Sequence, residues 1–238
     1  MRKLFVAAFA VFALALGAKA QNLQVFYDFG EDRQYVTTTF EMYKADNWGD
    51  TFWFIDHYYN PFDSKVNMGP GNGSYFEIER GLNFWQDSKL KDLSAHVEYD
   101  GLIVPGFSMG TWCFGVKYFL HSEDFSNMLT LYAMYEQFKP NGLSSADVPV
   151  KFSAVWSMND LFGVKGLVFK GFADFWGNNN IWGTETTSWS FLTEPQIWYN
   201  LGELVDNHLD IGGEIEISNN FAAKGFKINP CAGIRWTF

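Results

Sequence analysis

The sequence predicts an all-β protein, an antiparallel transmembrane β-barrel of about twelve strands that the C-terminal strand closes. Three observations predict this fold: a secretory leader, alternation of apolar and polar residues along most of the chain, and a wealth of aromatic residues. The alternation is clearest in residues 225–238, where apolar side chains occupy every second position from Phe226 to Phe238. A strand that is apolar outside and polar inside suits the seam of a membrane barrel, so Trp236 and Phe238 are expected to serve closure and assembly. For this strand alone, the last strand of a soluble sandwich is the alternative.

Residues 1–20 are expected to form a secretory signal peptide. Arg2 and Lys3 make its basic start, residues 4–16 are apolar, and Ala18-Lys19-Ala20 supplies the small-residue pattern at which such leaders are cleaved. The apolar core of about thirteen residues is too short to cross a bilayer as a helix. We therefore expect export, cleavage near Ala20, and a single barrel domain over residues 21–238 in the outer membrane of a Gram-negative bacterium.

Charge and cysteine content exclude some classes of function. Without Arg2, Lys3 and Lys19 the formal charge changes from −10 to about −13, and a chain this acidic repels phosphates, so nucleic acid is not an expected partner. Cys113 and Cys231 are far apart in the sequence. They could pair in an exported protein, but two cysteines make no disulfide framework. We interpret both as small strand residues.

The aromatic content favours a membrane barrel over a soluble domain. The chain holds 25 Phe, 11 Tyr and 10 Trp, which is more than one soluble core needs. After the leader no apolar run is long enough for a transmembrane helix. Girdles of rings at both membrane interfaces would place these residues naturally.

Alternating segments recur along the mature chain, separated by turn residues. We place strands at residues 23–29, 34–43, 48–59, 74–84, 93–104, 111–120, 128–138, 148–158, 164–176, 187–200, 207–218 and 225–238. Most are near the ten residues or so that a tilted membrane strand requires. An even count puts both chain ends on one side, and ten strands is the alternative. Long loops rich in Gly, Pro, Asn and Asp are expected on the opposite side, at residues 60–73, 139–147 and 177–186.

Polar residues that alternate within strands predict the face that lines the lumen. A Lys or Arg facing lipid at mid-membrane would cost about 2–4 kcal/mol, so the charged faces should turn inward. Rings can stack on flat ligands, and carboxylates can accept hydrogen bonds from hydroxyl groups. The alternative is that the charges only cross-link opposing walls. Arg80 breaks the pattern and is expected at a membrane interface. The expected lumen residues are Phe52, Phe54, Asp56, Glu77, Glu79, Lys151, Lys170, Phe172 and Asp174.

Residues 150–177, VKFSAVWSMNDLFGVKGLVFKGFADFWG, resemble the central hairpin of the Tsx family of nucleoside-specific outer-membrane channels. The features that carry the resemblance are Lys151 with Ser153, the turn Asp160-Leu161, and residues 171–175. Residues 41–56, 76–79 and 233–238 are similar to other strands of that family, so the resemblance follows most of the mature chain in order. It implies a barrel for passive uptake of small solutes, with nucleosides as the substrate.

Other functions remain as alternatives. His57, His96, His121 and His208 show no metal-ligand spacing such as HxxxH and accompany no serine nucleophile motif, so we expect no enzyme, no cofactor and no metal. A barrel enzyme acting on lipid could still hide a spatial triad. A structural or interaction barrel with a plugged lumen is the other alternative. A general porin is disfavoured, because a lumen of about twelve strands narrowed by rings admits only small solutes. The expected partners of this monomer are outer-membrane lipid, the barrel assembly machinery, and nucleosides or similar small solutes.

Overall fold

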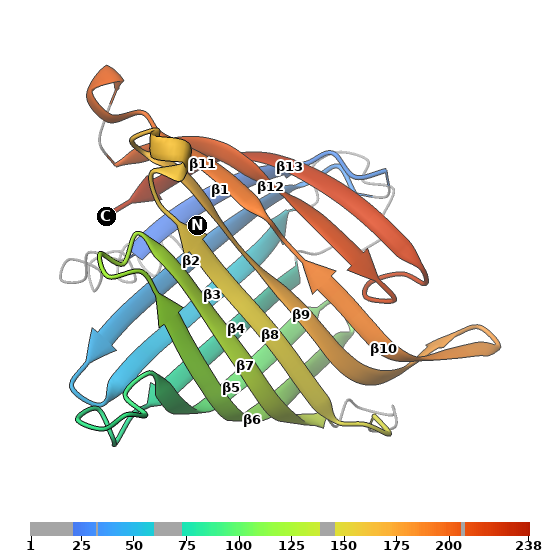
Figure 1. The fold of residues 1–238 in the computed structure, drawn as a ribbon. Coiled ribbons are helices and arrows are strands. Elements are labelled where there is room, and N and C mark those ends of the chain that lie inside the picture. The colour runs from blue at the N-terminus through green and yellow to red at the C-terminus, as the bar shows by residue number, and fades with distance from the viewer. Residues whose placement is uncertain (1–20, 32, 60–72, 139–145, 206–207) are drawn as a thin grey trace, which may run out of the picture.

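The computed structural model describes residues 21–31, 33–59, 73–138, 146–205 and 208–238. Within these ranges one antiparallel sheet runs as a meander and closes on itself, because β1 (Gln21–Asp28) pairs with β13 (Phe226–Thr237) (Figure 1). The closing role predicted for the C-terminal strand is confirmed. The predicted leader, residues 1–20, lies outside the described residues.

From β1 to β9 each strand pairs with the next one along the chain. The remaining strands of the wall are β2 (Val36–Asp46), β3 (Gly49–Tyr59), β4 (Gly73–Leu82), β5 (Leu93–Val104), β6 (Phe107–His121), β7 (Asn127–Phe138), β8 (Val150–Met158), β9 (Leu167–Trp182), β10 (Glu185–Thr193), β11 (Gln196–Asn200) and β12 (Leu209–Asn219). Two short 3-10 helices, Leu161–Gly163 and Gly202–Leu204, lie in turns. No helix in the described ranges is long and apolar enough to cross a membrane.

Two short strands, β10 and β11, lie end to end and together take the place of one strand beside β9. The first part of β9 pairs with β11, whereas its later part, from Ala173, pairs with β10. Glu194 and Pro195 separate the two short strands, and proline interrupts a strand because it has no amide hydrogen to donate. Opposite the break, a side chain at Gly171 would lie 2.5 Å from the Glu194 carbonyl oxygen. The described strands therefore form a closed twelve-strand barrel with one extra strand, so the predicted count is confirmed and the ten-strand alternative is wrong.

The prediction of a long loop at residues 177–186 is wrong, because most of these residues belong to two paired strands. β9 continues to Trp182, and after a turn at Gly183, which has a φ of 66°, β10 begins at Glu185. The Trp182 ring nitrogen donates to the Thr187 hydroxyl at 3.0 Å and ties the two strands together. The resulting hairpin extends past its neighbours (Figure 1). The other two predicted loops, 60–73 and 139–147, lie largely outside the described residues.

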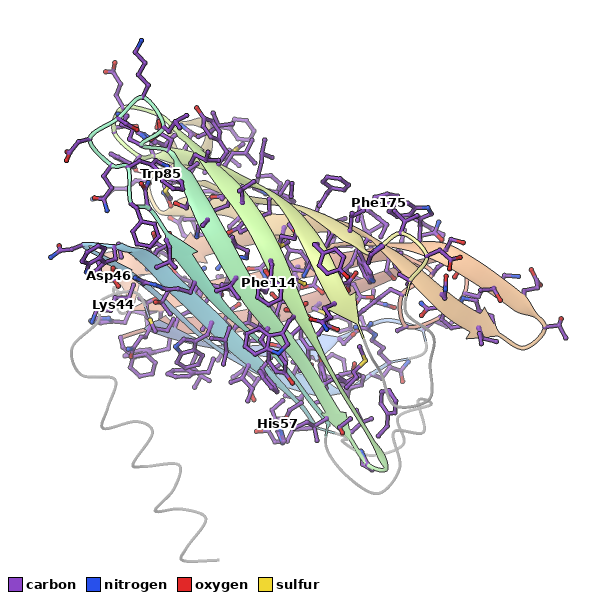
Figure 2. The ribbon with its side chains drawn as sticks, turned by 90° about the horizontal axis from the view of Figure 1, so that it is seen from below. Lys44, Asp46, His57, Trp85, Phe114 and Phe175 are labelled. Atoms are coloured by element: carbon purple, nitrogen blue, oxygen red, sulfur yellow. The ribbon has the colours of Figure 1, made fainter. Side chains whose placement is uncertain are left out.

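The two faces of the wall are chemically opposite. Successive strand residues point to opposite sides, and on β1 the buried residues Gln24, Phe26 and Asp28 alternate with outward ones. Outward positions carry exposed rings such as Phe114 on β6 and Phe175 on β9, which are 47% and 43% exposed (Figure 2). Most of the buried residues in the described ranges are polar or charged. An apolar exterior around a polar interior is the arrangement of a transmembrane barrel.

Arg80 faces outward, as its place in the alternation of β4 predicts. Its guanidinium forms an ion pair with Asp46 at 2.7 Å and donates to the Thr51 hydroxyl at 2.9 Å. Asp46 ends β2, and it lies beside Lys44 at one end of the barrel (Figure 2). The outward charge is therefore near the rim, where it does not face the middle of the wall.

The C-terminal strand closes the seam with contacts on both sides. The Phe238 amide donates to the Gln21 carbonyl oxygen at 2.9 Å, and the Phe238 ring lies 6.1 Å from Phe40. Trp236 faces outward between its register partners Leu23 and Leu209. The structure thus joins the first and last residues of the barrel, whereas the assembly role of this end stays a prediction.

Candidate functional site

All the residues predicted to line the lumen lie on the inward face of the wall. In an antiparallel pair, directly opposite residues share one face. The register pairs Phe52 with Glu79 and Phe54 with Glu77, and Glu79 is 7% exposed. The other predicted residues lie on the same face, as their register partners show. Asp56 is opposite Tyr75, Lys151 opposite Met134, Lys170 opposite Ser157, Phe172 opposite Val155, and Asp174 opposite Ser153.

The predicted aromatic residues separate into two groups. Phe52 and Phe54 on β3 have ring centroids 6.0 Å apart, and Phe54 lies 5.9 Å from Tyr75 on β4. The Tyr75 hydroxyl donates to Glu77 Oε1 at 2.5 Å. Phe172 belongs to β9, on the other side of the barrel (Figure 1). One wall therefore carries a ring cluster with a carboxylate beside it, and Phe172 is not part of that cluster.

One ion pair crosses the lumen. Lys170 on β9 places its ammonium 2.9 Å from Glu41 Oε1 on β2, although β11, β12, β13 and β1 lie between these strands in the wall. Glu41 also accepts hydrogen bonds from Asn22 at 2.8 Å and from Gln24 at 3.2 Å. Two other lysines form ion pairs with strands that lie closer in the wall. Lys117 on β6 pairs with Asp50 on β3, and Lys151 on β8 pairs with Glu98 on β5. For these lysines the wall-to-wall cross-link expected as the alternative is present.

Lys151 is the centre of an acidic cluster. Its ammonium lies 2.7 Å from Glu98, 3.3 Å from Asp100 and 3.5 Å from Asp174, so one cation faces three carboxylates. Lys151 and Glu98 are almost completely buried. Such close opposite charges stabilise each other strongly where water is scarce. This part of the lumen therefore holds more carboxyl groups than basic groups.

A second polar network lies along the seam. Arg33, in the connection between β1 and β2, reaches inward to Asp28 at 3.2 Å and to Glu216 on β12 at 2.6 Å. Arg235 on β13 pairs with Asp210 at 2.8 Å. Because the two carboxylate acceptors Glu216 and Asp210 both belong to β12, these pairs fix that strand to the closing strands.

Among the described residues Trp198 is the largest side chain that is fully buried, and it faces inward near the seam. The Arg235 guanidinium lies 4.8 Å from the ring centroid, within the range of a cation–π contact. Phe26 approaches the ring at 5.5 Å. The inward positions Gly212 and Gly233 leave the space that these rings fill, since an added side chain would lie 2.8 Å from Trp198 and 2.7 Å from Phe26, respectively.

The inward face carries more carboxylates than basic groups in the described part of the chain. The carboxylates on the strands are Asp28, Glu41, Asp50, Asp56, Glu77, Glu79, Glu98, Asp100, Glu136, Asp174, Asp210, Glu214 and Glu216. The basic groups are Arg33, Lys117, Lys151, Lys170, Lys227 and Arg235. A low-dielectric wall focuses the potential of such a surplus, which favours cations over anions near the inner face.

Several inward residues escaped prediction although a signal for them exists. Ser94, His96, Glu98 and Asp100 occupy every second position of β5, the pattern of a polar inner face. Glu79, His96 and Glu98 bring three metal-ligating atoms within 4.8 Å of one another. No spacing motif marks this group, because its members belong to two strands. Cys113 and Cys231, on β6 and β13, are both free.

Comparison with known families and solved structures supports the fold. The family described as "Domain of unknown function (DUF5020)" matches residues 20–238. No curated protein matches the chain significantly. The NanC porin aligns with a TM-score of 0.57 at 7% identity, over 92% of this chain and 100% of that chain. A membrane protein solved in work on in-meso crystallization aligns with a TM-score of 0.50 at 10% identity, over 92% and 84% of the two chains. The KdgM porin in complex with disordered oligogalacturonate has a TM-score of 0.49 at 9% identity, over 92% and 99%. At such low identity the likeness to the NanC porin shows the shared barrel fold alone.

Proposed function

The chain belongs to the DUF5020 family, and we propose that it is a passive outer-membrane channel for small solutes, with nucleosides as the substrate. The observation that carries the proposal is the closed barrel whose outer face is apolar and whose inner face is polar and acidic. An exposed apolar wall of this extent needs lipid around it. A polar interior suits the passage of water and polar solutes. The name porin given to NanC agrees with this function.

The choice of nucleosides depends on the resemblance of residues 150–177 to the Tsx family, and the lumen is compatible with it. A nucleoside has no charge, so an acidic lumen admits it while repelling the phosphate of a nucleotide. Phe52, Phe54 and Tyr75 form a ring cluster on which a base can stack. Glu77 lies beside that cluster and can accept hydrogen bonds from sugar hydroxyl groups. Asp56 pairs in register with Tyr75 and adds a further acceptor.

The second candidate is a barrel whose lumen is plugged and which serves structure or interaction. The Lys170–Glu41 ion pair favours it, because this pair spans the lumen. Trp198 with Arg235 fills further space near the seam. A lipid-acting barrel enzyme is the less favoured alternative, and phospholipid hydrolysis by the purified barrel would reveal it.

Uptake into proteoliposomes separates these functions. We expect adenosine to enter faster than both adenosine monophosphate and a neutral sugar of similar size. Loss of one stacked ring costs roughly 1–3 kcal/mol, so Phe52→Ala should weaken nucleoside binding about five- to a hundredfold. Glu77→Gln should slow adenosine more than the sugar. The matched control is Phe114→Ala, which removes an outward ring and leaves the lumen unchanged.

The outcomes point to different functions. If Phe52→Ala and Glu77→Gln change adenosine and sugar uptake in the same proportion, the barrel is a simple pore without a nucleoside site. If neither solute enters wild-type vesicles faster than empty ones, the plugged barrel is correct and the channel is refuted.

A further inference from the structure

We propose that the lumen binds one divalent transition-metal ion, such as Zn²⁺, between Glu79 on β4 and His96 and Glu98 on β5. His96 Nε2 lies 3.1 Å from Glu98 Oε2 and 3.9 Å from Glu79 Oε2. One ligand atom from each of the three residues lies within 4.8 Å of the others. Glu79 is the register partner of Phe52, so this site borders the ring cluster of the proposed nucleoside path.

The scaffold holds the three side chains together without relying on a loop. Glu79 and Glu98 are direct partners on neighbouring strands. His96 is two residues before Glu98 and therefore projects from the same face. The side chains of His96, Glu98 and Glu79 are 0%, 3% and 9% exposed, so their surroundings restrict their movement.

The distances and the ligand types suit a zinc-like ion. Zinc binds histidine nitrogen and carboxylate oxygen at about 2.0–2.2 Å, which in a tetrahedral site separates ligand atoms by about 3.3 Å. The two distances from His96 Nε2, 3.1 and 3.9 Å, are on either side of that value, so small side-chain rotations complete the geometry. An imidazole ligand favours zinc and its transition-metal neighbours over Ca²⁺ or Mg²⁺, which prefer oxygen.

A further buried carboxylate lies in the same part of the lumen, on β7. Glu136 on β7 is the register partner of Cys113, which is in turn the partner of Glu98, so its side chain lies in the same row across the inner face. Glu136 is 7% exposed, and its Oε2 atom has no hydrogen-bond partner among the described residues. Burial of a carboxylate oxygen without a partner is costly unless a cation or a proton compensates it.

The lysines nearby are bound to other carboxylate oxygens. Lys151 contacts Glu98 through Oε1 at 2.7 Å, which leaves Oε2 of the same carboxylate directed at His96. Lys117 is engaged with Asp50. Within the described ranges the only ion-pair partner of Glu79 is His96. Glu79 Oε2 and Glu98 Oε2 thus both face His96 Nε2, at 3.9 and 3.1 Å.

The test uses the full chain folded in detergent, with folding checked by the shift in gel mobility on heating that β-barrels show. Equilibrium dialysis with Zn²⁺ should give one ion per folded chain, and Ca²⁺ should not compete at equal concentration. Glu79→Gln and His96→Gln should each weaken Zn²⁺ binding by at least about tenfold. The control Glu214→Gln makes the same charge change elsewhere in the lumen, where Glu214 accepts from Gln196 at 2.8 Å, and should leave Zn²⁺ affinity unchanged.

The visible absorption spectrum of bound Co²⁺ provides a second measurement that does not depend on affinity alone. Bound in this site, Co²⁺ should show the visible ligand-field absorption of a nitrogen- and oxygen-ligated ion, and Glu79→Gln should abolish it. If the folded wild-type barrel binds no stoichiometric Zn²⁺, or if Glu214→Gln weakens binding as much as Glu79→Gln, the proposed site is refuted. Because these measurements require no transport, their outcome is independent of the channel function.

Discussion

Removal of the Lys170 ammonium tests whether an ion pair closes part of the lumen. Lys170 contacts both Glu41 oxygens, at 2.9 and 3.3 Å, across the barrel interior. In Lys170→Ala the bridge is lost and the side chain no longer crosses the lumen. Glu41 keeps its hydrogen bonds from Asn22 and Gln24, so its carboxylate does not lose all its partners.

The cost in stability follows from the geometry. Unit charges 2.9 Å apart attract by about 6 kcal/mol at an effective dielectric constant of 20, and by about 1.4 kcal/mol in bulk water. The Lys170 and Glu41 side chains are 22% and 18% exposed, so solvent screens part of this attraction. Desolvation and the ordering of a long side chain subtract more. We expect Lys170→Ala to lower the free energy of unfolding by about 1–3 kcal/mol.

Single-channel recording in a planar bilayer measures the functional effect. Lys170→Ala should have a larger conductance than wild type and a stronger preference for cations, because the variant opens the lumen and removes a positive charge from it. Lys44→Ala is the matched control, since Lys44 faces outward near the rim and its loss should leave conductance unchanged. If Lys170→Ala and Lys44→Ala both conduct like wild type, and their unfolding free energies are equal, the pair does not obstruct the path.

Two further variants test the barrel itself. Deletion of Phe238 removes the amide that donates to the Gln21 carbonyl at the seam, so barrel yield in the membrane should fall while export continues; normal yield in membrane fractions would contradict the assembly role. Gly212→Ala places a methyl group 2.1 Å from the Ile197 carbonyl oxygen and 2.8 Å from Trp198. Such overpacking should lower the free energy of unfolding in denaturant by about 1–3 kcal/mol. An unchanged denaturation midpoint would show that the neighbouring strand shifts to accommodate the methyl group.

The faces of the strands could be predicted from the sequence because a strand has a period of two. The segment predicted at residues 93–104 coincides with β5, and Glu77, Lys151 and Asp174 lie on the inner side as expected. A one-residue change of register would have turned each of them toward lipid, so the apolar outer face strongly determines the register. Local chemistry was sufficient for this part of the fold.

Contacts across the lumen could not be predicted in the same way. Lys170 and Glu41 are 129 residues apart, and they meet only because the tilt and stagger of the closed barrel place them at one height. Alternation along single strands contains no information on that height. For the same reason, the grouping of Glu79 with His96 and the separation of Phe172 from Phe52 became visible only in the folded chain.

The two errors in the strand positions have local causes. The predicted strand 187–200 conceals a break, because Glu194 and Pro195 fit the alternation although proline cannot continue the ladder of hydrogen bonds. The glycine and asparagines at residues 177–180 suggested a loop, but Gly177 and Asn180 pair with β10 and the strand continues through them. In both places backbone pairing decided the structure, and residue type alone was misleading.

The most direct test of the account is the reversal potential of the wild-type protein in a planar bilayer under a KCl gradient. The surplus of carboxylates on the inner face predicts discrete channel openings with a reversal potential of the sign given by K⁺ permeation. This selectivity should decline as salt is raised from 0.1 M to 1 M, where the screening length falls from about 10 Å to about 3 Å. Discrete openings that select Cl⁻, or a folded and inserted barrel that never opens, would contradict the proposal of an acidic, open lumen.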